Sequence, residues 1–179
     1  MLKLQAGDFF CTENPMALGK AIRFIERLRD HEKSVYSHSG IITDPTGITL
    51  EALWTVRGNH LNAYQGDQLI IGRWVDLTSN GLEKGYEAIS PEVDTEYPFW
   101  RLVFFMTPRA VQQYVSTGKY AVCSELTCKF LLGAGCTDLT TWEAQDPQNV
   151  ADMINKGKRM VKIFEGVWSP HVYLKELYL

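Results

Sequence analysis

The sequence predicts an α+β fold in which an antiparallel sheet packs against helices. Strand-like segments return on one another through a turn, and segments with apolar residues at helical spacing lie apart from them along the chain. No repeat, low-complexity segment or linker composition interrupts the 179 residues. We therefore expect residues 1–179 to form one domain.

The strands are expected mostly in the first half of the chain. Residues 35–43 and 48–54 flank Asp44-Pro45-Thr46-Gly47, whose turn chemistry predicts a hairpin. Further strands are expected at residues 8–11, 68–75 and 160–164. The polar, glycine-bearing stretch 57–66 is expected to be a loop that leads into the next strand.

Four segments have apolar residues at helical spacing, with signals for a helix start or end beside them. They predict helices over residues 15–28, 108–115, 123–132 and 147–156. Gly133 and Gly135 follow the third of them, as is typical of helix C-termini. The aromatic-rich stretch 82–106 is interrupted by prolines and is expected to contain short helices and loops.

Composition and charge exclude several classes of protein. With 18 Lys+Arg against 21 Asp+Glu, the formal charge is −3, which argues against a dedicated nucleic-acid-binding protein. Apolar runs such as residues 102–106 are far shorter than the roughly 20 residues of a membrane-spanning helix. No long apolar stretch precedes Asp8, so we expect no signal peptide and a cytoplasmic or phage-encoded protein.

The cysteines, Cys11, Cys123, Cys128 and Cys136, are too few and too unevenly spaced for a disulfide framework, so we expect free thiols. The chain has no C-x-x-C motif, and its histidines lack ligand spacing. We therefore expect neither a metal nor a cofactor. Three of the cysteines, Cys11, Cys128 and Cys136, are interpreted as ordinary core residues.

Cys123 lies at the expected start of a helix. Backbone N–H groups and the helix dipole at that end favour a thiolate, and the same amides can hold the oxyanion of an acyl-transfer intermediate. The alternative is a buried, inert cysteine, which is common in protein cores.

A cysteine nucleophile needs a histidine to exchange its proton, and that histidine needs a third group to orient it. His38 is the natural candidate, and Gly40 beside it leaves space for close approach. The hairpin brings Glu51 roughly opposite the His38 strand, within plausible reach of the imidazole. The alternatives are a strand histidine bonded to backbone and a carboxylate that faces solvent. His60 is a weaker third member because it lies in the expected loop.

Several aromatic residues either line a groove for an apolar or peptide-like ligand or belong to the core. They are Trp54, Tyr64, Trp74, Tyr97, Phe99 and Trp100.

Four motifs follow one another in a characteristic order between residues 7 and 135. They are Gly7-Asp8, Tyr36-Ser37-His38-Ser39-Gly40-Ile41-Ile42, Leu50-Glu51-Ala52 and Val122-Cys123-Ser124-Glu125-Leu126. Together they resemble the circularly permuted NlpC-like cysteine hydrolases of the papain-like superfamily, particularly the YiiX-like group. In that family the histidine strand precedes the cysteine helix.

The resemblance implies a papain-like fold with the nucleophile at a helix N-terminus. It implies that Cys123 is the nucleophile, His38 the general base and then acid, and Glu51 the orienting residue. It further implies that Tyr36, beside the histidine, contributes to substrate binding.

The substrate class stays open at this level. We expect hydrolysis of an amide bond, for example in a cell-wall peptide. Because the family also resembles lecithin retinol acyltransferase, a lipid amide or ester is the second enzymatic option, either hydrolysed or used as an acyl donor. A non-catalytic binding or virion module is the alternative from a different class.

Overall fold

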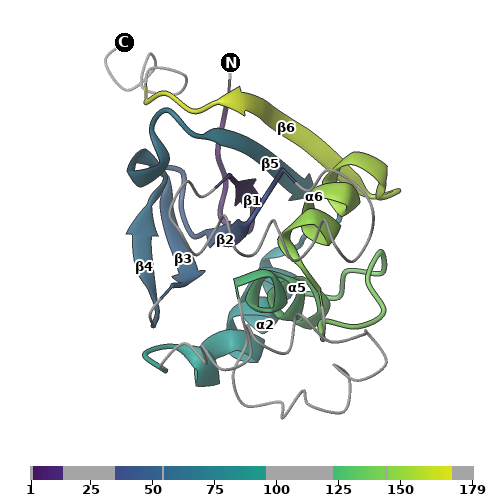
Figure 1. The fold of residues 1–179 in the computed structure, drawn as a ribbon. Coiled ribbons are helices and arrows are strands. Elements are labelled where there is room, and N and C mark those ends of the chain that lie inside the picture. The colour runs from purple at the N-terminus through teal and green to yellow at the C-terminus, as the bar shows by residue number, and fades with distance from the viewer. Residues whose placement is uncertain (1, 14–34, 54, 96–122, 144, 171–179) are drawn as a thin grey trace, which may run out of the picture.

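The computed structural model describes residues 2–13, 35–53, 55–95, 123–143 and 145–170. Within them the chain forms a six-stranded antiparallel sheet, with strand order β4-β3-β2-β1-β5-β6, and helices α2, α5 and α6 (Figure 1). The strands are β1 (Phe9–Thr12), β2 (His38–Ile42), β3 (Ile48–Ala52), β4 (Val56–His60), β5 (Gln68–Trp74) and β6 (Met160–Val167). The helices are α2 (Ser79–Ile89), α5 (Cys123–Gly133) and α6 (Pro147–Lys156), with the short 3₁₀ helices η1 (Leu61–Tyr64) and η2 (Ser90–Glu92). The α+β class expected from the sequence is confirmed.

The sheet separates two apolar cores because successive side chains of a strand point to opposite faces. In β1, Phe9 and Cys11 belong to the helix-facing core, whereas Phe10 belongs to the core on the other face. Helices α5 and α6 lie on the first face, as Figure 1 shows. The second face is covered by η1 and by Trp168, which follows β6. The central strand β1 is consequently buried on both faces.

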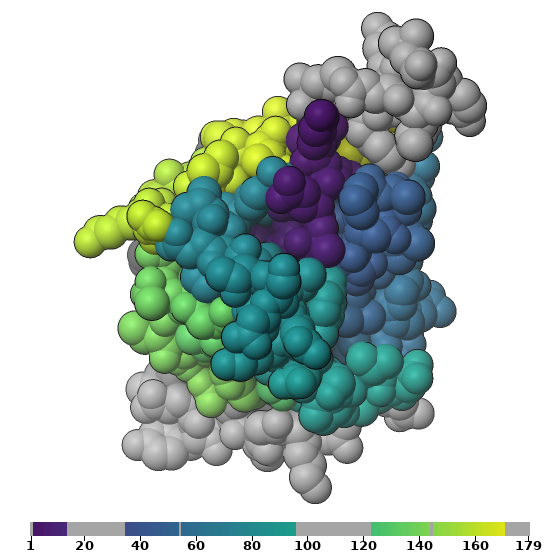
Figure 2. Space-filling model, turned by 180° about the vertical axis from the view of Figure 1, so that it is seen from behind, coloured from purple at the N-terminus to yellow at the C-terminus, as the bar shows by residue number. Residues whose placement is uncertain are grey.

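The N-terminal segment lies in the middle of the sheet. Figure 2 shows it from behind (purple), between the blue β2–β3 hairpin and the yellow β6 region. Strand β1 pairs with β2 on one side and with β5 on the other. This position holds β2, which begins at His38, at the centre of the fold.

The predicted hairpin is confirmed, with Ile41 opposite Leu50 and Ile42 opposite Thr49. In its turn, Asp44 Oδ1 accepts a hydrogen bond of 2.8 Å from the backbone N–H of Thr46. The structure gives β2 and β3 five residues each, so both strands are shorter than the segments expected from the sequence.

The predicted loop over residues 57–66 is wrong, because most of this stretch forms β4 and η1. Strand β4 is an edge strand that pairs with β3, and Arg57 and Gly58 are exposed on it. An edge strand with an exposed side has a polar sequence, and Gly58 and Asn59 add turn-like composition. The pairing with β3 outweighs these local signals.

The helix predictions over 123–132 and 147–156 are confirmed by α5 and α6. Asp146 caps α6 by accepting a 2.7 Å hydrogen bond from the N–H of Asn149. Helix α2 begins at Ser79, before the stretch where short helices were expected, and β6 extends to Val167, beyond the expected strand end. The expected helices 15–28 and 108–115 lie outside the described residues.

Candidate active site

The β2–β3 hairpin brings together two of the residues singled out from the sequence. His38 Nε2 lies 2.7 Å from Glu51 Oε2, within hydrogen-bond and ion-pair distance. His38 is 4% exposed and Glu51 is fully buried. The pair is therefore shielded from solvent, where electrostatic interactions are stronger than at a surface.

Gly40 makes this contact possible. The strand register places Gly40 opposite Glu51, with His38 as the diagonal neighbour on the same face. A Cβ atom on Gly40 would lie 2.7 Å from Glu51 Cγ and 2.7 Å from Phe10 Cε1. Because glycine lacks that atom, the Glu51 side chain can lie across β2 and reach the imidazole.

Two further side chains donate hydrogen bonds to the Glu51 carboxylate. The Thr49 hydroxyl donates to Oε1, and the Tyr64 hydroxyl donates to Oε2, the oxygen that also faces His38. The Tyr64 ring packs 5.4 Å from the Phe10 ring and 5.9 Å from the His38 ring, measured between centroids. The sequence analysis named Tyr64 only among the aromatic residues that either line a groove or belong to the core, and it did not name Thr49. The one sequence signal for Thr49 is that it lies two residues before Glu51 on a strand, and so on the same face.

Cys123 lies on the other side of the imidazole. It is the first residue of α5 as the structure describes it, it is 4% exposed, and the interaction of its side chain with His38 contributes to the raised pKa of the imidazole. Since Nε2 of His38 faces Glu51, Nδ1 is the ring nitrogen left for the thiol. The three residues thus form the series Cys123–His38–Glu51, in which His38 and Glu51 are hydrogen-bonded and Cys123 interacts with the same imidazole.

The first turn of α5 is anchored from two sides. Thr127 Oγ1 donates a 3.2 Å hydrogen bond to the carbonyl of Cys123, and the Ser39 hydroxyl lies 3.2 Å from the same Thr127 oxygen. On the other side, Ser124 Oγ donates a 2.6 Å hydrogen bond to the carbonyl of Gln145. Strand β2 therefore carries His38 and, in the next residue, a polar contact to the helix turn that carries Cys123.

The site stabilises opposite charges on His38 and Glu51. Burial disfavours the charged imidazole, but hydrogen bonds and charge interactions with Cys123 and Glu51 outweigh it and raise the pKa of His38. Burial likewise disfavours the charged carboxylate, but hydrogen bonds from His38, Thr49 and Tyr64 lower the pKa of Glu51. At neutral pH the pair is consequently imidazolium and carboxylate.

Tyr36 lies two residues before His38, ahead of the first residue of β2. It is 6% exposed and belongs to the helix-facing core together with Cys11. Burial, with a contribution from Glu165, raises the pKa of Tyr36 to about 12. Its expected role in substrate binding stays a prediction.

The other cysteines and His60 have structural surroundings. Cys11 Sγ donates a 3.5 Å hydrogen bond to the carbonyl of Pro147, and burial raises the pKa of Cys128 and of Cys136. All four cysteines are free thiols, as the sequence predicts. His60 caps η1, where its Nδ1 accepts a 3.0 Å hydrogen bond from the N–H of Asn62.

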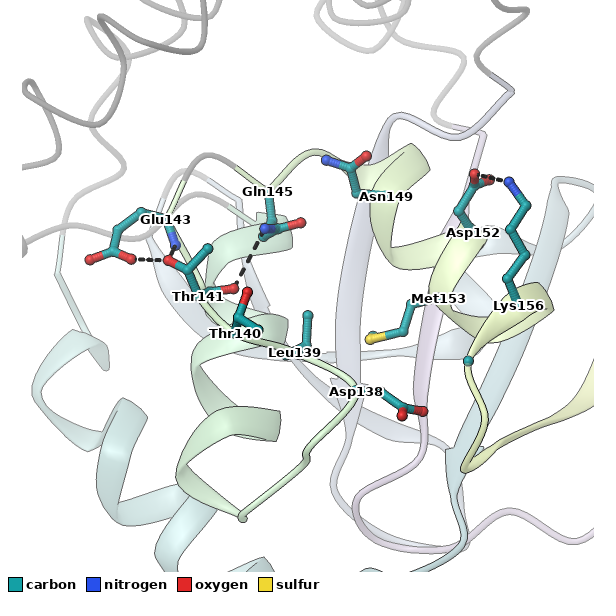
Figure 3. A pocket seen from close by; sticks show the side chains of 11 residues that line it. Asp138, Leu139, Thr140, Thr141, Glu143, Gln145, Asn149, Asp152, Met153 and Lys156 are labelled. Carbon is teal, nitrogen blue, oxygen red and sulfur yellow. Dashed lines mark hydrogen bonds and ion pairs between the residues drawn. The ribbon is translucent and has the colours of Figure 1, made fainter.

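A pocket of about 890 Å³ opens between α6 and the segment that joins α5 to α6 (Figure 3). The carbonyl of Gln145, a lining residue, accepts the hydrogen bond from Ser124, the residue after Cys123, whereas Cys123, His38 and Glu51 do not themselves line the pocket. The complete lining is Asp138, Leu139, Thr140, Thr141, Glu143, Gln145, Asn149, Asp152, Met153, Lys156 and Gly157. The lining combines polar and apolar surface in nearly equal parts and includes three carboxylates and one ammonium group.

No family model and no curated protein sequence matches the chain. Among solved structures, the chain is similar to one described as metalloprotein YiiX from Escherichia coli O157:H7, DUF1105. The two share 19% sequence identity with a TM-score of 0.53, and the likeness covers 97% of this chain and 93% of that one. No helix in the described residues has the length and hydropathy needed to cross a membrane. The likeness to YiiX, which extends over almost the whole of both chains, shows that this protein has a YiiX-like α+β fold.

Proposed function

We propose that the protein is a papain-like, permuted NlpC-like cysteine hydrolase that cleaves an amide bond through an acyl-enzyme. The observation that carries this proposal is the buried series Cys123–His38–Glu51, in which the Glu51 carboxylate is hydrogen-bonded to the imidazole and Cys123 interacts with the same ring. A thiol, an imidazole and an orienting carboxylate in this order are the components of a cysteine nucleophile and its proton carrier.

In the acylation step, the Cys123 sulfur attacks the substrate carbonyl carbon while His38 holds the thiol proton. The C–N bond then breaks, the imidazolium gives its proton to the leaving amine, and a thioester remains on Cys123. Backbone N–H groups at the start of α5 stabilise the intermediate oxyanion.

In the deacylation step, His38 takes a proton from water, and the hydroxide formed attacks the thioester carbon. The C–S bond breaks, the carboxylic acid leaves, and the thiolate–imidazolium pair is restored. Glu51 remains ionised throughout and stabilises the imidazolium that forms in both steps.

The pocket next to α5 favours a peptide-like amide over a lipid as the substrate. Only Leu139 and Met153 give it apolar side chains, whereas Asp138, Glu143 and Asp152 contribute carboxylates. An acyl chain of a lipid would desolvate these carboxylates without forming hydrogen bonds to them. A peptide offers N–H groups that these oxygens accept.

YiiX is described as a metalloprotein, and the candidate residues here do not fit a metal site. No three His, Cys, Asp or Glu side chains are grouped as metal ligands in the part of the chain that the structure describes. In addition, Nε2 of His38 already faces Glu51. We therefore derive no step through a metal.

The first test is the alkylation rate of each cysteine with iodoacetamide, from acidic to alkaline pH, read by peptide mass mapping. Cys123 is expected to react faster than the other cysteines at mildly acidic and neutral pH, because the raised pKa of His38 keeps an imidazolium beside the sulfur. In His38→Ala the rate at mildly acidic pH is expected to fall about a hundredfold.

Cys128 serves as the internal comparison because it is 1% exposed and burial raises the pKa of its thiol. It is expected to stay unreactive in the folded protein at every pH tested. Equal rates at Cys123 in the wild type and in His38→Ala would refute the proposed nucleophile.

A second prediction concerns the pocket. Asn149→Trp places an indole in the lining of the pocket and is expected to slow hydrolysis of a p-nitrophenyl ester of an acylated dipeptide by about tenfold. Hydrolysis of p-nitrophenyl acetate, which does not need the pocket, is expected to remain near the wild-type rate. The matched control is Asn155→Trp, since Asn155 lies on α6, is exposed and does not line the pocket. If both tryptophan variants slow the dipeptide ester equally, the pocket has no role in binding.

A further inference from the structure

We propose that Thr49 and Tyr64 are positioning residues that hold the Glu51 carboxylate against His38, an assignment that rests on the proposed function. Neither residue reaches the Cys123 sulfur through a hydrogen bond that the structure records, so each acts through Glu51.

The first argument is the burial of Glu51. Its side chain is fully buried, so its charge depends on hydrogen bonds from the protein. One oxygen receives the Thr49 hydroxyl, and the other receives both Tyr64 and His38. Without the hydroxyls of Thr49 and Tyr64, the imidazole of His38 would be the remaining hydrogen-bond donor to the buried Glu51 carboxylate among these described contacts.

The second argument is orientation. A glutamate side chain has several rotatable bonds, and it keeps one geometry only where contacts fix it. Thr49 fixes one oxygen from the same strand, and Tyr64 fixes the other from η1, a different element. The Tyr64 ring is itself held against Phe10. These two points of attachment leave the second oxygen directed at His38 Nε2.

The titratable groups that face this carboxylate are His38 on β2, Tyr64 on η1 and, through His38, Cys123 on α5. On β4, Asn59 interacts with the Tyr64 side chain and opposes the rise of its pKa. Burial and the charge of Glu51 raise the pKa of Tyr64, so it stays a neutral donor.

The sign of the expected effect follows from these contacts. The hydrogen bonds lower the pKa of Glu51, so loss of one donor raises it. As the pH falls, Glu51 then becomes protonated earlier, and the imidazolium of His38 loses its partner earlier. Alkylation of Cys123 is consequently lost at a higher pH than in the wild type.

The experiment measures Cys123 alkylation by iodoacetamide against pH in Tyr64→Phe, Thr49→Val and the double variant. Each substitution removes a hydroxyl and keeps the shape of the side chain. The acidic limb is expected to move up by about one pH unit in each single variant and further in the double variant. Thr49→Ser keeps a hydroxyl at this position, and its acidic limb of Cys123 alkylation is expected to lie at the wild-type pH.

Tyr86→Phe is the matched control for loss of a buried tyrosine hydroxyl. The Tyr86 hydroxyl is buried and makes no hydrogen bond with the described part of the chain, and its ring packs on Phe130 instead. This variant is expected to keep the wild-type pH profile. Thermal denaturation of every variant separates loss of folding from a shifted pH profile. If either Tyr64→Phe or Thr49→Val unfolds, the profile of the other single variant tests the positioning role.

The outcomes for the two proposals differ. If wild-type Cys123 shows no alkylation that depends on His38, the proposed function fails. If it does, but Tyr64→Phe and Thr49→Val both retain the wild-type acidic limb, the positioning role is overturned and the hydrolase proposal stands.

Discussion

Cys123→Ser is expected to lower hydrolysis of p-nitrophenyl acetate at least about a thousandfold and to abolish the acetyl adduct seen by mass spectrometry. The serine hydroxyl is far less acidic than a thiol, and His38 in this site is already favoured in its protonated form. It is therefore a poor base for a hydroxyl nucleophile. Rapid quenching in acid and peptide mapping will show whether the acetyl group is on residue 123.

Cys128→Ala is the control for this experiment, because Cys128 lies on the same helix and is buried in the helix-facing core. It is expected to lose some stability and to retain the acetyl adduct at Cys123. If Cys123→Ser hydrolyses the ester at the wild-type rate, Cys123 is not the nucleophile and the catalytic proposal is wrong. The alternative of a non-catalytic binding module is then favoured.

The core of the site could be predicted from the sequence because it depends on local pairing. A turn at residues 44–47 brings two short strands together, and period-two alternation then determines which side chains share a face. The contact between His38 and Glu51 follows from this hairpin and from the glycine at position 40. The helix that begins at Cys123 likewise follows from local spacing.

Tyr64 could not be assigned in the same way because its position depends on long-range pairing. It follows the edge strand β4, whose polar and glycine-containing sequence has loop character. Only when β4 pairs with β3 does η1 return over the sheet and bring the Tyr64 hydroxyl to Glu51. Hydrophobic periodicity, the main sequence signal, carries no information about such a polar edge.

The comparison with YiiX supports the fold, whereas the chemistry is argued from side chains. At 19% identity the arrangement of strands and helices is shared over almost the whole chain. Catalysis requires that particular atoms lie within hydrogen-bond distance, and a shared fold does not ensure this. The contacts around His38 therefore carry the functional argument.

Gly40→Ala is expected to destabilise the protein by about 1–3 kcal/mol and to separate Glu51 from His38. The added methyl group would lie 2.7 Å from both Glu51 Cγ and the Phe10 ring, and Phe10 is fully buried and has little room to move. Glu51 is then the side chain that shifts, which withdraws its carboxylate from the imidazole. Chemical denaturation measures the stability, and the acidic limb of Cys123 alkylation measures the loss of the ion pair.

Gly58→Ala is the matched control, since Gly58 lies on the edge strand β4 of the same sheet and the nearest atom to its added methyl group would be the Thr49 carbonyl oxygen at 3.8 Å. That distance is an ordinary contact, so this variant is expected to change stability by less than about 0.5 kcal/mol and to keep the wild-type alkylation profile. Both substitutions add the same methyl group to a strand glycine, so the difference between them isolates the space next to Glu51. If Gly40→Ala keeps both the stability and the profile of Gly58→Ala, the close approach of Glu51 to β2 does not set the geometry of the site.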